Sequence, residues 1–247
     1  MLRAVLRLLR VVLHLLWGLW VMVWVFPRLP AQARDARVQR WAQDMLRCLG
    51  IRLRLQGTPP EQGPVLLVSN HISWLDIVVL HAARHCRFVS KADVRHWPLV
   101  GRMATAAGTL YIERESRRDA LRTVHRMVEA LQTGDVLAVF PEGTTGDGRS
   151  VLPFHANLLQ AAISADAPVQ AVALQFVHAS DHSISLAPIY VGEDTLVQSV
   201  WRTLRARDLE AVVRFAPAQH HSGRDRRAWA DDLRSEIVAL CASSADL

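Results

Sequence analysis

Hydrophobic and polar residues follow two different patterns along the chain, and the pattern changes near residue 50. Residues 11–26 are continuously apolar apart from His14, and residues 31–49 repeat an apolar residue every three or four positions. A continuous apolar run is typical of a membrane-embedded helix, and a three-four repeat is typical of an amphipathic helix. The first fifty residues are therefore expected to form an apolar helix followed by an amphipathic one.

From residue 51 onward, strand and helix patterns alternate. Short apolar runs predict strands at residues 51–57, 64–70, 87–91, 109–113, 135–140 and 167–177. Periodic segments predict helices at residues 74–83, 97–106, 117–132 and 225–240, and two further apolar segments, 183–192 and 209–215, complete the body. This alternation predicts an α/β fold: a mixed, mostly parallel sheet covered by helices, behind an N-terminal membrane-embedded helical anchor.

The apolar segment can be interpreted in three ways. At about 1.5 Å per residue it falls short of the roughly 30 Å hydrocarbon core, so it spans only with help from the leucines before it, or it lies half inserted. Its tryptophans favour half insertion, because indole prefers the headgroup boundary. A cleaved signal peptide is the third possibility, since Ala31–Ala33 resembles a cleavage site, but the apolar stretch is slightly long for one. A retained anchor is favoured.

Length sets the domain organisation. A chain of 247 residues is long enough for one sizeable α/β body with an appendage. We therefore expect residues 1–50 to form the anchor and the amphipathic helix, and residues 51–247 to form the catalytic domain. The amphipathic helix either packs on this domain or makes a second contact with the membrane.

Composition favours a membrane partner over nucleic acid. Hydrophobic residues make up 51% of the chain and the formal net charge is +6, a combination that suits an anionic membrane surface. Arg and Lys are scattered and no zinc-finger, RRM or basic-zipper pattern is present, so no nucleic-acid partner is expected. The cysteines Cys48, Cys86 and Cys241 fit no metal or redox spacing and are expected to be reduced thiols on the cytosolic side.

The stretch "SNHISWLDIVVL" carries the first candidate chemistry. His71 falls where a buried strand ends, and Asp76 follows in the first turns of the next helix. The two side chains can meet only if His71 lies in the turn before the helix, with Ser73 as the expected N-cap. A carboxylate bonded to one imidazole nitrogen raises the basicity of the other, which can then take a proton from a hydroxyl. The alternative is an ordinary loop histidine beside a first-turn acid.

Two other stretches suggest binding of an anion. "GTLYIERES" offers Gly108 and Arg114, and "FPEGTTGDG" offers Glu142, Gly143 and Thr144 directly after a buried strand. Gly and Thr in such a turn can aim backbone amides at an anion, and an arginine can hold a phosphate with two hydrogen bonds. The second stretch lacks the Lys and Ser or Thr of a nucleotide-binding P-loop.

In this order, "NHISWLD", "GTLYIER", "FPEGT" and "APVQAVAL" resemble the four blocks of the glycerolipid acyltransferase family, which includes 1-acyl-glycerol-3-phosphate acyltransferase. The resemblance implies that His71 is the general base, that Asp76 orients it, and that an acceptor hydroxyl attacks an acyl thioester directly. It also implies no bound cofactor, with acyl-CoA or acyl carrier protein as the donor. The residues expected to bind substrate are Asn70, Gly108, Arg114, Glu142, Gly143 and Thr144.

Two departures from the family pattern bear on the acceptor. The fourth block lacks a second proline near Ala171, and residues 154–157 read Phe-His-Ala-Asn where many relatives have a Lys-containing "F-K-x-G" stretch. A missing lysine beside a phosphate site weakens the case for lysophosphatidic acid. The expected reaction is therefore acylation of a lysophospholipid, foremost 1-acyl-glycerol-3-phosphate to give phosphatidic acid, with lyso-ornithine lipid as the alternative.

The resemblance also predicts where the protein works. Membrane lipids, the lysophospholipid and the donor thioester are the expected partners, and the expected location is the inner membrane with the active site facing the cytoplasm. A hydrolase that uses the same base with water, and a non-catalytic membrane-binding module, are the competing functions. His81 and His85 have the spacing of a helical metal pair, but no third ligand is evident, so we interpret them as exposed helix residues and expect no metal.

Overall fold

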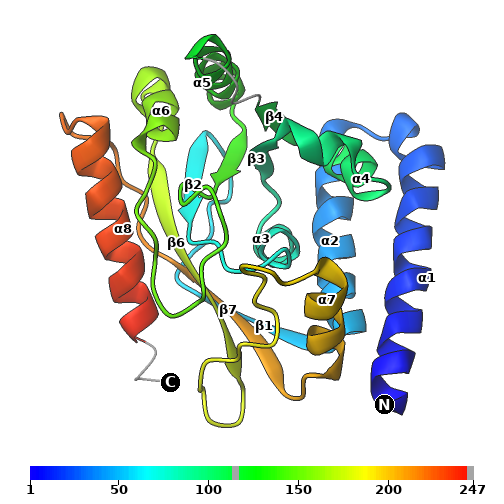
Figure 1. Cartoon of the computed structure of the whole chain (residues 1–247). Helices are drawn as coiled ribbons and strands as arrows, with labels where there is room; N and C mark the ends of the chain where they lie inside the picture. The colour runs from blue at the N-terminus through cyan, green and yellow to red at the C-terminus, as the bar shows by residue number, and fades with distance from the viewer. Residues whose placement is uncertain (113–116, 244–247) are drawn as a thin grey trace.

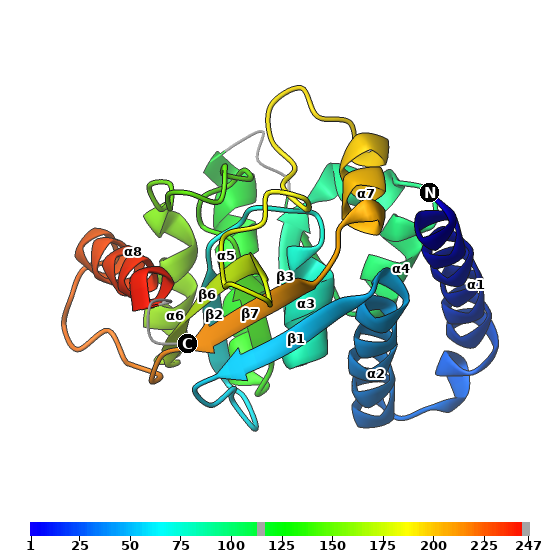
Figure 2. The same cartoon turned by 90° about the horizontal axis from the view of Figure 1, so that it is seen from below.

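A computed structural model describes residues 1–112 and 117–243, and its elements form layers around one central sheet (Figure 1). Helices α2, α3 and α7 cover one face of the sheet, with α1 outside them, and α5, α6 and α8 cover the other (Figure 2). The helices are α1 (Leu2–Trp24), α2 (Ala31–Leu49), α3 (Asp76–Ala83), α4 (Val100–Ala106), α5 (Arg117–Gln132), α6 (Leu159–Ala165), α7 (Leu196–Arg205) and α8 (Arg226–Ala242), with short 3₁₀ turns at Phe26–Arg28, Ala92–His96 and Ala156–Leu158.

The sheet is mixed and mostly parallel, as predicted. Its strands are β1 (Ile51–Gln56), β2 (Val65–Ser69), β3 (Arg87–Lys91), β4 (Leu110–Ile112), β5 (Val136–Val139), β6 (Val169–His178) and β7 (Leu209–Phe215). They lie in the order β1-β7-β6-β2-β5-β3-β4, and only the β6–β7 pair is antiparallel among the pairs of described strands. The first strand lies at an edge, where its alternating polar residues can face solvent.

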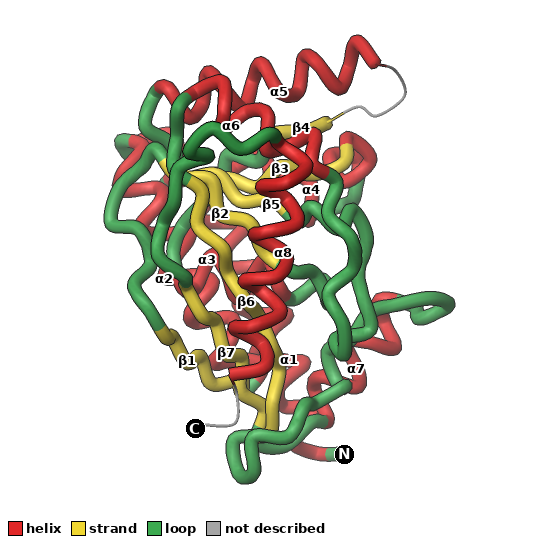
Figure 3. Tube along the Cα trace, turned by 90° about the vertical axis from the view of Figure 1, so that its left-hand side faces the viewer, coloured by secondary structure: helices red, strands yellow, loops and turns green. Residues whose placement is uncertain are grey.

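Alternate residues of the central strands belong to two separate hydrophobic cores, one on each face of the sheet. In β2, Val65 and Leu67 point toward α2 and α3, whereas Leu66 and Val68 point toward α5, α6 and α8. Because both faces are covered, the strand is apolar throughout, which is why it reads as a continuous hydrophobic run. Figure 3 shows α8 lying over the face of the sheet that α5 and α6 also cover.

Helices α1 and α2 form an antiparallel hairpin along one side of the molecule (Figures 1 and 2). The ring of His14 stacks on Trp41 with centroids 5.2 Å apart, and each of the two side chains bonds the other residue's backbone carbonyl. Gly18 lets the indole approach α1, since a Cβ there would lie 2.4 Å from Trp41 Nε1. The amphipathic helix therefore packs on both the body and the first helix.

Some elements differ from the prediction. Helix α1 begins at Leu2, nine residues before the predicted apolar run, and α3 begins at Asp76 with Leu75 as its cap, so the expected N-cap at Ser73 is wrong. Helices α6 and α7 were not predicted. The segment 183–192 contains no strand, only an isolated bridge between Ile184 and Val177.

His81 and His85 are both buried, and His85 lies beyond the end of α3, which corrects their interpretation as exposed helix residues. His81 and His85 stack with ring centroids 5.3 Å apart, and His85 Nε2 lies 3.1 Å from Asp35 Oδ1 on α2. Asp35 is the acidic neighbour that joins this pair to the hairpin. No group of three or more His, Cys, Asp or Glu side chains in the described ranges is arranged to hold a metal ion.

Candidate active site

The catalytic candidates gather where β2 ends. β2 stops at Ser69, and six residues then cross the edge of the sheet to α3. β2 lies between β5 and β6 and is parallel to both, so the carboxyl ends of three strands point the same way there. The loop after β5 folds back over this turn, and the Gly146 amide donates to the His71 carbonyl at 2.7 Å. Open α/β sheets bind ligands at such an edge.

His71 and Asp76 are joined by a hydrogen bond. Nδ1 of His71 lies 2.8 Å from Oδ2 of Asp76, and the same oxygen accepts from the amides of Ile72 at 2.7 Å and Ser73 at 2.9 Å. The separation of five residues is bridged as predicted, because His71 lies in the turn and Asp76 opens the helix. The Asp76 side chain is fully buried, whereas the His71 side chain keeps 19% of its surface exposed.

This geometry assigns the tautomer of the imidazole. An ionised carboxylate only accepts hydrogen bonds, so the proton of neutral His71 is assigned to Nδ1 and the lone pair to Nε2. Three donors fix the carboxylate of Asp76, and its position in the first turn of α3 favours its negative charge. Nε2 is therefore the nitrogen that can take a proton from a hydroxyl.

Asn70 fixes the start of the turn. Its amide nitrogen donates to the Leu174 carbonyl at 2.9 Å, and its side-chain oxygen accepts from the Leu174 amide at 2.8 Å. The buried side chain thus continues the β2–β6 ladder one residue beyond Ser69, where backbone pairing ends. Asn70 positions the start of the turn that carries His71, and its predicted contact with substrate stays a prediction.

Glu142 links the turn to the loop that follows β5. Its Oε1 accepts from the His71 amide at 2.7 Å, and its Oε2 accepts from the Leu152 amide at 2.9 Å. Burial raises the pKa of the Glu142 carboxyl, and the two amide donors act against this rise. Both carboxylate oxygens accept hydrogen bonds from backbone amides, so Glu142 stabilises the turn. Its predicted contact with the acceptor stays a prediction.

A third segment supports the turn from the other side. The Ser73 hydroxyl donates to the Pro188 carbonyl at 2.5 Å, and the Tyr190 amide donates to the Ile72 carbonyl at 3.2 Å. Trp74 adds a hydrogen bond to Ser199 of α7 at 3.1 Å. The segment 183–192, for which sequence suggested no particular role, thus helps hold the catalytic turn.

Phe140 belongs to the site and was not predicted from the sequence. Its ring stacks on His71 with centroids 4.0 Å apart and planes 12° apart, and Phe88 stacks on Phe140 at 5.7 Å. One face of the imidazole is therefore covered by apolar surface. Phe140 directly precedes the Pro141–Glu142 motif at the end of a buried strand, and this position is a signal from which it could have been found.

The remaining predicted residues fall in three places. Gly143 and the exposed Thr144 share the turn of Glu142, and Gly143 has a φ of 71°, which glycine adopts without strain. Gly108 lies before β4, at the amino edge of the sheet, where Arg87 Nε donates to its carbonyl at 2.8 Å. The structure does not bring Gly108 to His71, and its φ of 83° is explained by the turn between α4 and β4. Arg114 lies outside the described residues.

Comparison with known proteins identifies the family of the chain. The family model named Acyltransferase matches residues 50–175. The 1-acyl-sn-glycerol-3-phosphate acyltransferase of Neisseria meningitidis is 36% identical over 220 residues, covering 87% of this chain and 85% of that protein. The lyso-ornithine lipid O-acyltransferase of Pseudomonas aeruginosa is 34% identical over 251 residues, covering 99% and 96%. The crystal structure of the 1-acyl-sn-glycerophosphate (LPA) acyltransferase PlsC from Thermotoga maritima has a TM-score of 0.67 at 16% identity, covering 98% of each chain.

Fold and comparisons together define an enzyme that transfers acyl groups. The chain belongs to the acyltransferase family, which confirms the resemblance of its four sequence blocks. The Thermotoga structure shows that the fold is shared over nearly the whole chain, including the part that holds α1 and α2.

Proposed function

We propose that this acyltransferase moves a fatty acyl group from an acyl thioester to the free hydroxyl of a lysolipid, with 1-acyl-glycerol-3-phosphate as the preferred acceptor and phosphatidic acid as the product. The observation that carries the proposal is the 2.8 Å hydrogen bond between His71 and the buried Asp76 at the carboxyl edge of the sheet. The match to the Neisseria enzyme, which is named for this acceptor, supports it.

The proposed reaction uses only groups of the chain and its two substrates. Nε2 of His71 takes the proton of the acceptor hydroxyl while the oxygen attacks the thioester carbonyl. The carbon–sulfur bond then breaks, and the leaving thiolate takes the proton from the imidazolium. Asp76 stabilises the imidazolium while it exists, because its negative charge faces Nδ1. An ester replaces a thioester, a free thiol is released, and no cofactor takes part.

Lyso-ornithine lipid is the second candidate acceptor. The Pseudomonas relative named for it matches 99% of the chain, and the segment Phe154–Asn157 lacks the lysine that many family members have. This segment lies beside the candidate site, since the His155 amide donates to the Pro141 carbonyl at 2.8 Å. An acceptor without a phosphate would have less need of a cation there.

The anchor supports catalysis at a membrane. Within the described residues, α1 with the turn after it is long and apolar enough to cross a bilayer. Its partner α2, however, carries exposed charges along its length, among them Arg34, Arg37 and Arg40. A spanning α1 would draw these charges into hydrocarbon, which is costly, so the hairpin is better suited to lie in the interface with the apolar face of α1 embedded. Residues 51–247 would then form the acyltransferase domain, on the cytoplasmic side of the inner membrane, where acyl thioesters are made.

A competition assay tests the proposal. The full chain in detergent receives acyl-CoA or acyl carrier protein thioester, together with lysophosphatidic acid and lyso-ornithine lipid, and the products are identified by mass spectrometry. Phosphatidic acid should dominate, and the His71→Ala variant should lose activity by about 10²- to 10⁴-fold. His125→Ala, which removes an exposed histidine of α5, is the matched control.

Three results would contradict the proposal in different ways. Product from lyso-ornithine lipid alone would keep the mechanism and replace the acceptor. Free fatty acid formed at the same rate with and without acceptor would show a hydrolase. Full activity of His71→Ala, with the control also active, would remove the histidine from the mechanism.

A further inference from the structure

The first turns of α1 carry three arginines on one face. Arg3, Arg7 and Arg10 are spaced by four and three residues, so their side chains lie on neighbouring turns of the helix. Like charges at this spacing repel one another. None of the three forms an ion pair with a carboxylate in the part of the chain that the structure describes. The cluster therefore carries uncompensated positive charge.

Arg7 explains how this end of α1 is attached to the body. It is buried, and its Nη1 donates to the carbonyls of Leu204 at 3.0 Å and Ala206 at 2.7 Å, while Nη2 donates to that of Gly50 at 3.3 Å. These carbonyls lie at the carboxyl ends of α7 and α2, where a cation is favourable. Arg7 thus attaches α1 to the body of the protein. Arg3 and Arg10 make no such contact within the described residues, so their charges remain available to a ligand.

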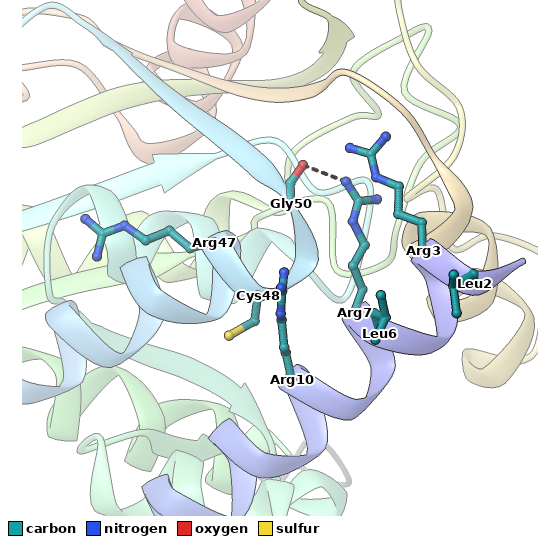
Figure 4. A pocket seen from close by; sticks show the side chains of 8 residues that line it. All are labelled: Leu2, Arg3, Leu6, Arg7, Arg10, Arg47, Cys48 and Gly50. Atoms are coloured by element: carbon teal, nitrogen blue, oxygen red, sulfur yellow. Dashed lines mark hydrogen bonds between the residues drawn. The ribbon is translucent and has the colours of Figure 1, made fainter.

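A cavity of about 330 Å³ lies at this junction of α1 and α2. It is lined by Leu2, Arg3, Leu6, Arg7, Arg10, Arg47, Cys48 and Gly50. Figure 4 shows that Arg3, Arg7 and Arg10 reach from α1 toward the junction, whereas Arg47 points away, and Arg47 is paired with Asp44. Cations and leucines line the same cavity, so it suits a ligand that is anionic at one end and apolar at the other.

Strand directions place the cavity on the side of the sheet where the catalytic turn lies. β1 begins directly after Gly50, is parallel to β7, and is therefore antiparallel to β6 and β2. The start of β1 thus lies on the side toward which β2 points with its carboxyl end. From the cavity, exposed apolar side chains continue along α1, namely Leu9, Val12, Leu13, Leu16, Trp17 and Trp20.

We propose that this cavity, which we call the hairpin pocket, binds the phosphate of an anionic membrane phospholipid, with Arg3 and Arg10 as its ligands and Leu2 and Leu6 against the adjoining acyl region. A bound lipid would compensate the charge that no carboxylate compensates, and it would seat the apolar face of α1 in the bilayer. The pocket shares no residue with the candidate active site, and the proposal holds whichever lysolipid the enzyme acylates.

Vesicle binding tests the site without using catalysis. The full chain is mixed with phosphatidylcholine vesicles or with vesicles containing phosphatidylglycerol, and the partition coefficient is measured by flotation. Each cation at an anionic surface contributes roughly a five-fold change, so R3Q/R10Q should lower binding to anionic vesicles about 25-fold. The matched variant R226Q/R227Q on α8 removes the same charge on the side of the sheet opposite the hairpin and should change binding much less. R37Q/R40Q on α2 removes it within the interfacial hairpin but outside the pocket, and should lower binding less than R3Q/R10Q does. An equal loss in R37Q/R40Q and R3Q/R10Q would overturn the pocket in favour of diffuse charge.

Alkylation of Cys48 gives a second, local readout. Cys48 lines the hairpin pocket, so a neutral maleimide should react with it more slowly in phosphatidylglycerol vesicles than in phosphatidylcholine vesicles when the protein is bound to both, with Cys241 as the internal reference. In R3Q/R10Q, Cys48 should react at the same rate in both kinds of vesicle, and the temperature of thermal unfolding should equal that of the parent chain. Equal protection in both kinds of vesicle would contradict a phosphate site. Protection by inorganic phosphate alone would overturn the lipid assignment.

Discussion

Charged and apolar side chains are arranged in opposite ways in two regions of the molecule. One region is the turn between β2 and α3, and the other is the hairpin of α1 and α2. At the turn, Asp76 and Glu142 are buried and each is held by backbone amides, so the charges have fixed partners before any substrate arrives. At the hairpin, Arg3 and Arg10 are exposed, and leucines and tryptophans of α1 face outward. Catalysis needs charges that are already in place, whereas a surface made for a lipid can leave its partners to the membrane.

The largest effect is expected from Asp76→Asn, which tests whether the reaction depends on the negative charge of Asp76. His71 Nδ1 and the amides of Ile72 and Ser73 share Oδ2, so an asparagine oxygen in that place keeps these three hydrogen bonds as a neutral acceptor. The charge that would stabilise the imidazolium is lost, so kcat should fall by about 10³-fold or more. Membrane binding should not change.

The measurement is a single-turnover acylation rate beside vesicle flotation, with Asp231→Asn on the exposed face of α8 as the control. A rate within a few-fold of the parent chain would show that the negative charge of Asp76 does not set the rate of the reaction. A parallel loss of membrane binding would show that the two regions are not independent.

Glu142→Gln tests the bracing of the same turn. Glutamine keeps one acceptor oxygen, but its amino group would face the second amide, so either the His71 or the Leu152 N–H loses its partner. An unpaired buried amide costs about 1–3 kcal/mol, partly offset because the neutral side chain is easier to bury. We expect a net loss of about 2 kcal/mol in the free energy of unfolding, measured by denaturant titration, with the exposed Glu193→Gln as the control. An unchanged stability would mean that the two hydrogen bonds contribute nothing.

These two residues also show how far the sequence can take the prediction. The His71–Asp76 pair was predictable because both residues lie in one short turn, whose geometry follows from where the strand ends and the helix begins. The partners of Glu142 were not, because Leu152 and His71 meet it only through the path of a long loop in the folded chain. Phe140 stacks on His71 for the same long-range reason.

The fold divides in the same way. Continuous apolar runs predicted β2, β5 and β6, since both faces of these strands are covered. Helix α7 was missed because it is short and only half of its residues are apolar, although Thr195 and Gln198 form a capping box that sequence could have revealed. The close approach of α1 to Trp41 depends on Gly18, and only the packed hairpin shows it.

A pH experiment compares the buried His81 of α3 with the exposed His125 of α5. Burial lowers the pKa of His81 to about 3, with a contribution from the charge of His85, while Asp35 opposes the shift. The unfolded chain therefore binds a proton between about pH 6.5 and pH 3 that the folded chain does not, so stability falls as the pH drops below 6.5.

At pH 5 this single group should cost up to about 2 kcal/mol. His81→Gln should remove that part of the acid sensitivity, measured as the difference between the unfolding free energies at pH 7.5 and pH 5. The exposed His125→Gln should leave the difference unchanged. The same difference in His81→Gln and in the parent chain would mean that His81 is not the group that titrates.

The smallest effect is expected at the hairpin itself, from Gly18→Ala. The new Cβ would lie 2.4 Å from Trp41 Nε1 and 3.1 Å from two ring carbons, so the indole that stacks on His14 must move. This overpacking costs roughly 1–3 kcal/mol, but alanine recovers about 1 kcal/mol of helix propensity, so the net loss should be about 1 kcal/mol. In the Trp41→Ala background the clash is absent, and Gly18→Ala should then stabilise the chain by about 1 kcal/mol. The double-mutant cycle should therefore give a coupling energy of about 2 kcal/mol, whereas additive effects would give zero. Thermal unfolding of the four proteins in detergent measures this coupling energy.

The single-turnover acylation rate should remain that of the parent chain in every member of the cycle, because the hydrogen bonds and the ring contact of Trp41 go to His14 of α1 and not to the turn that carries His71. A rate that followed the stability of the hairpin would show that the anchor also positions His71.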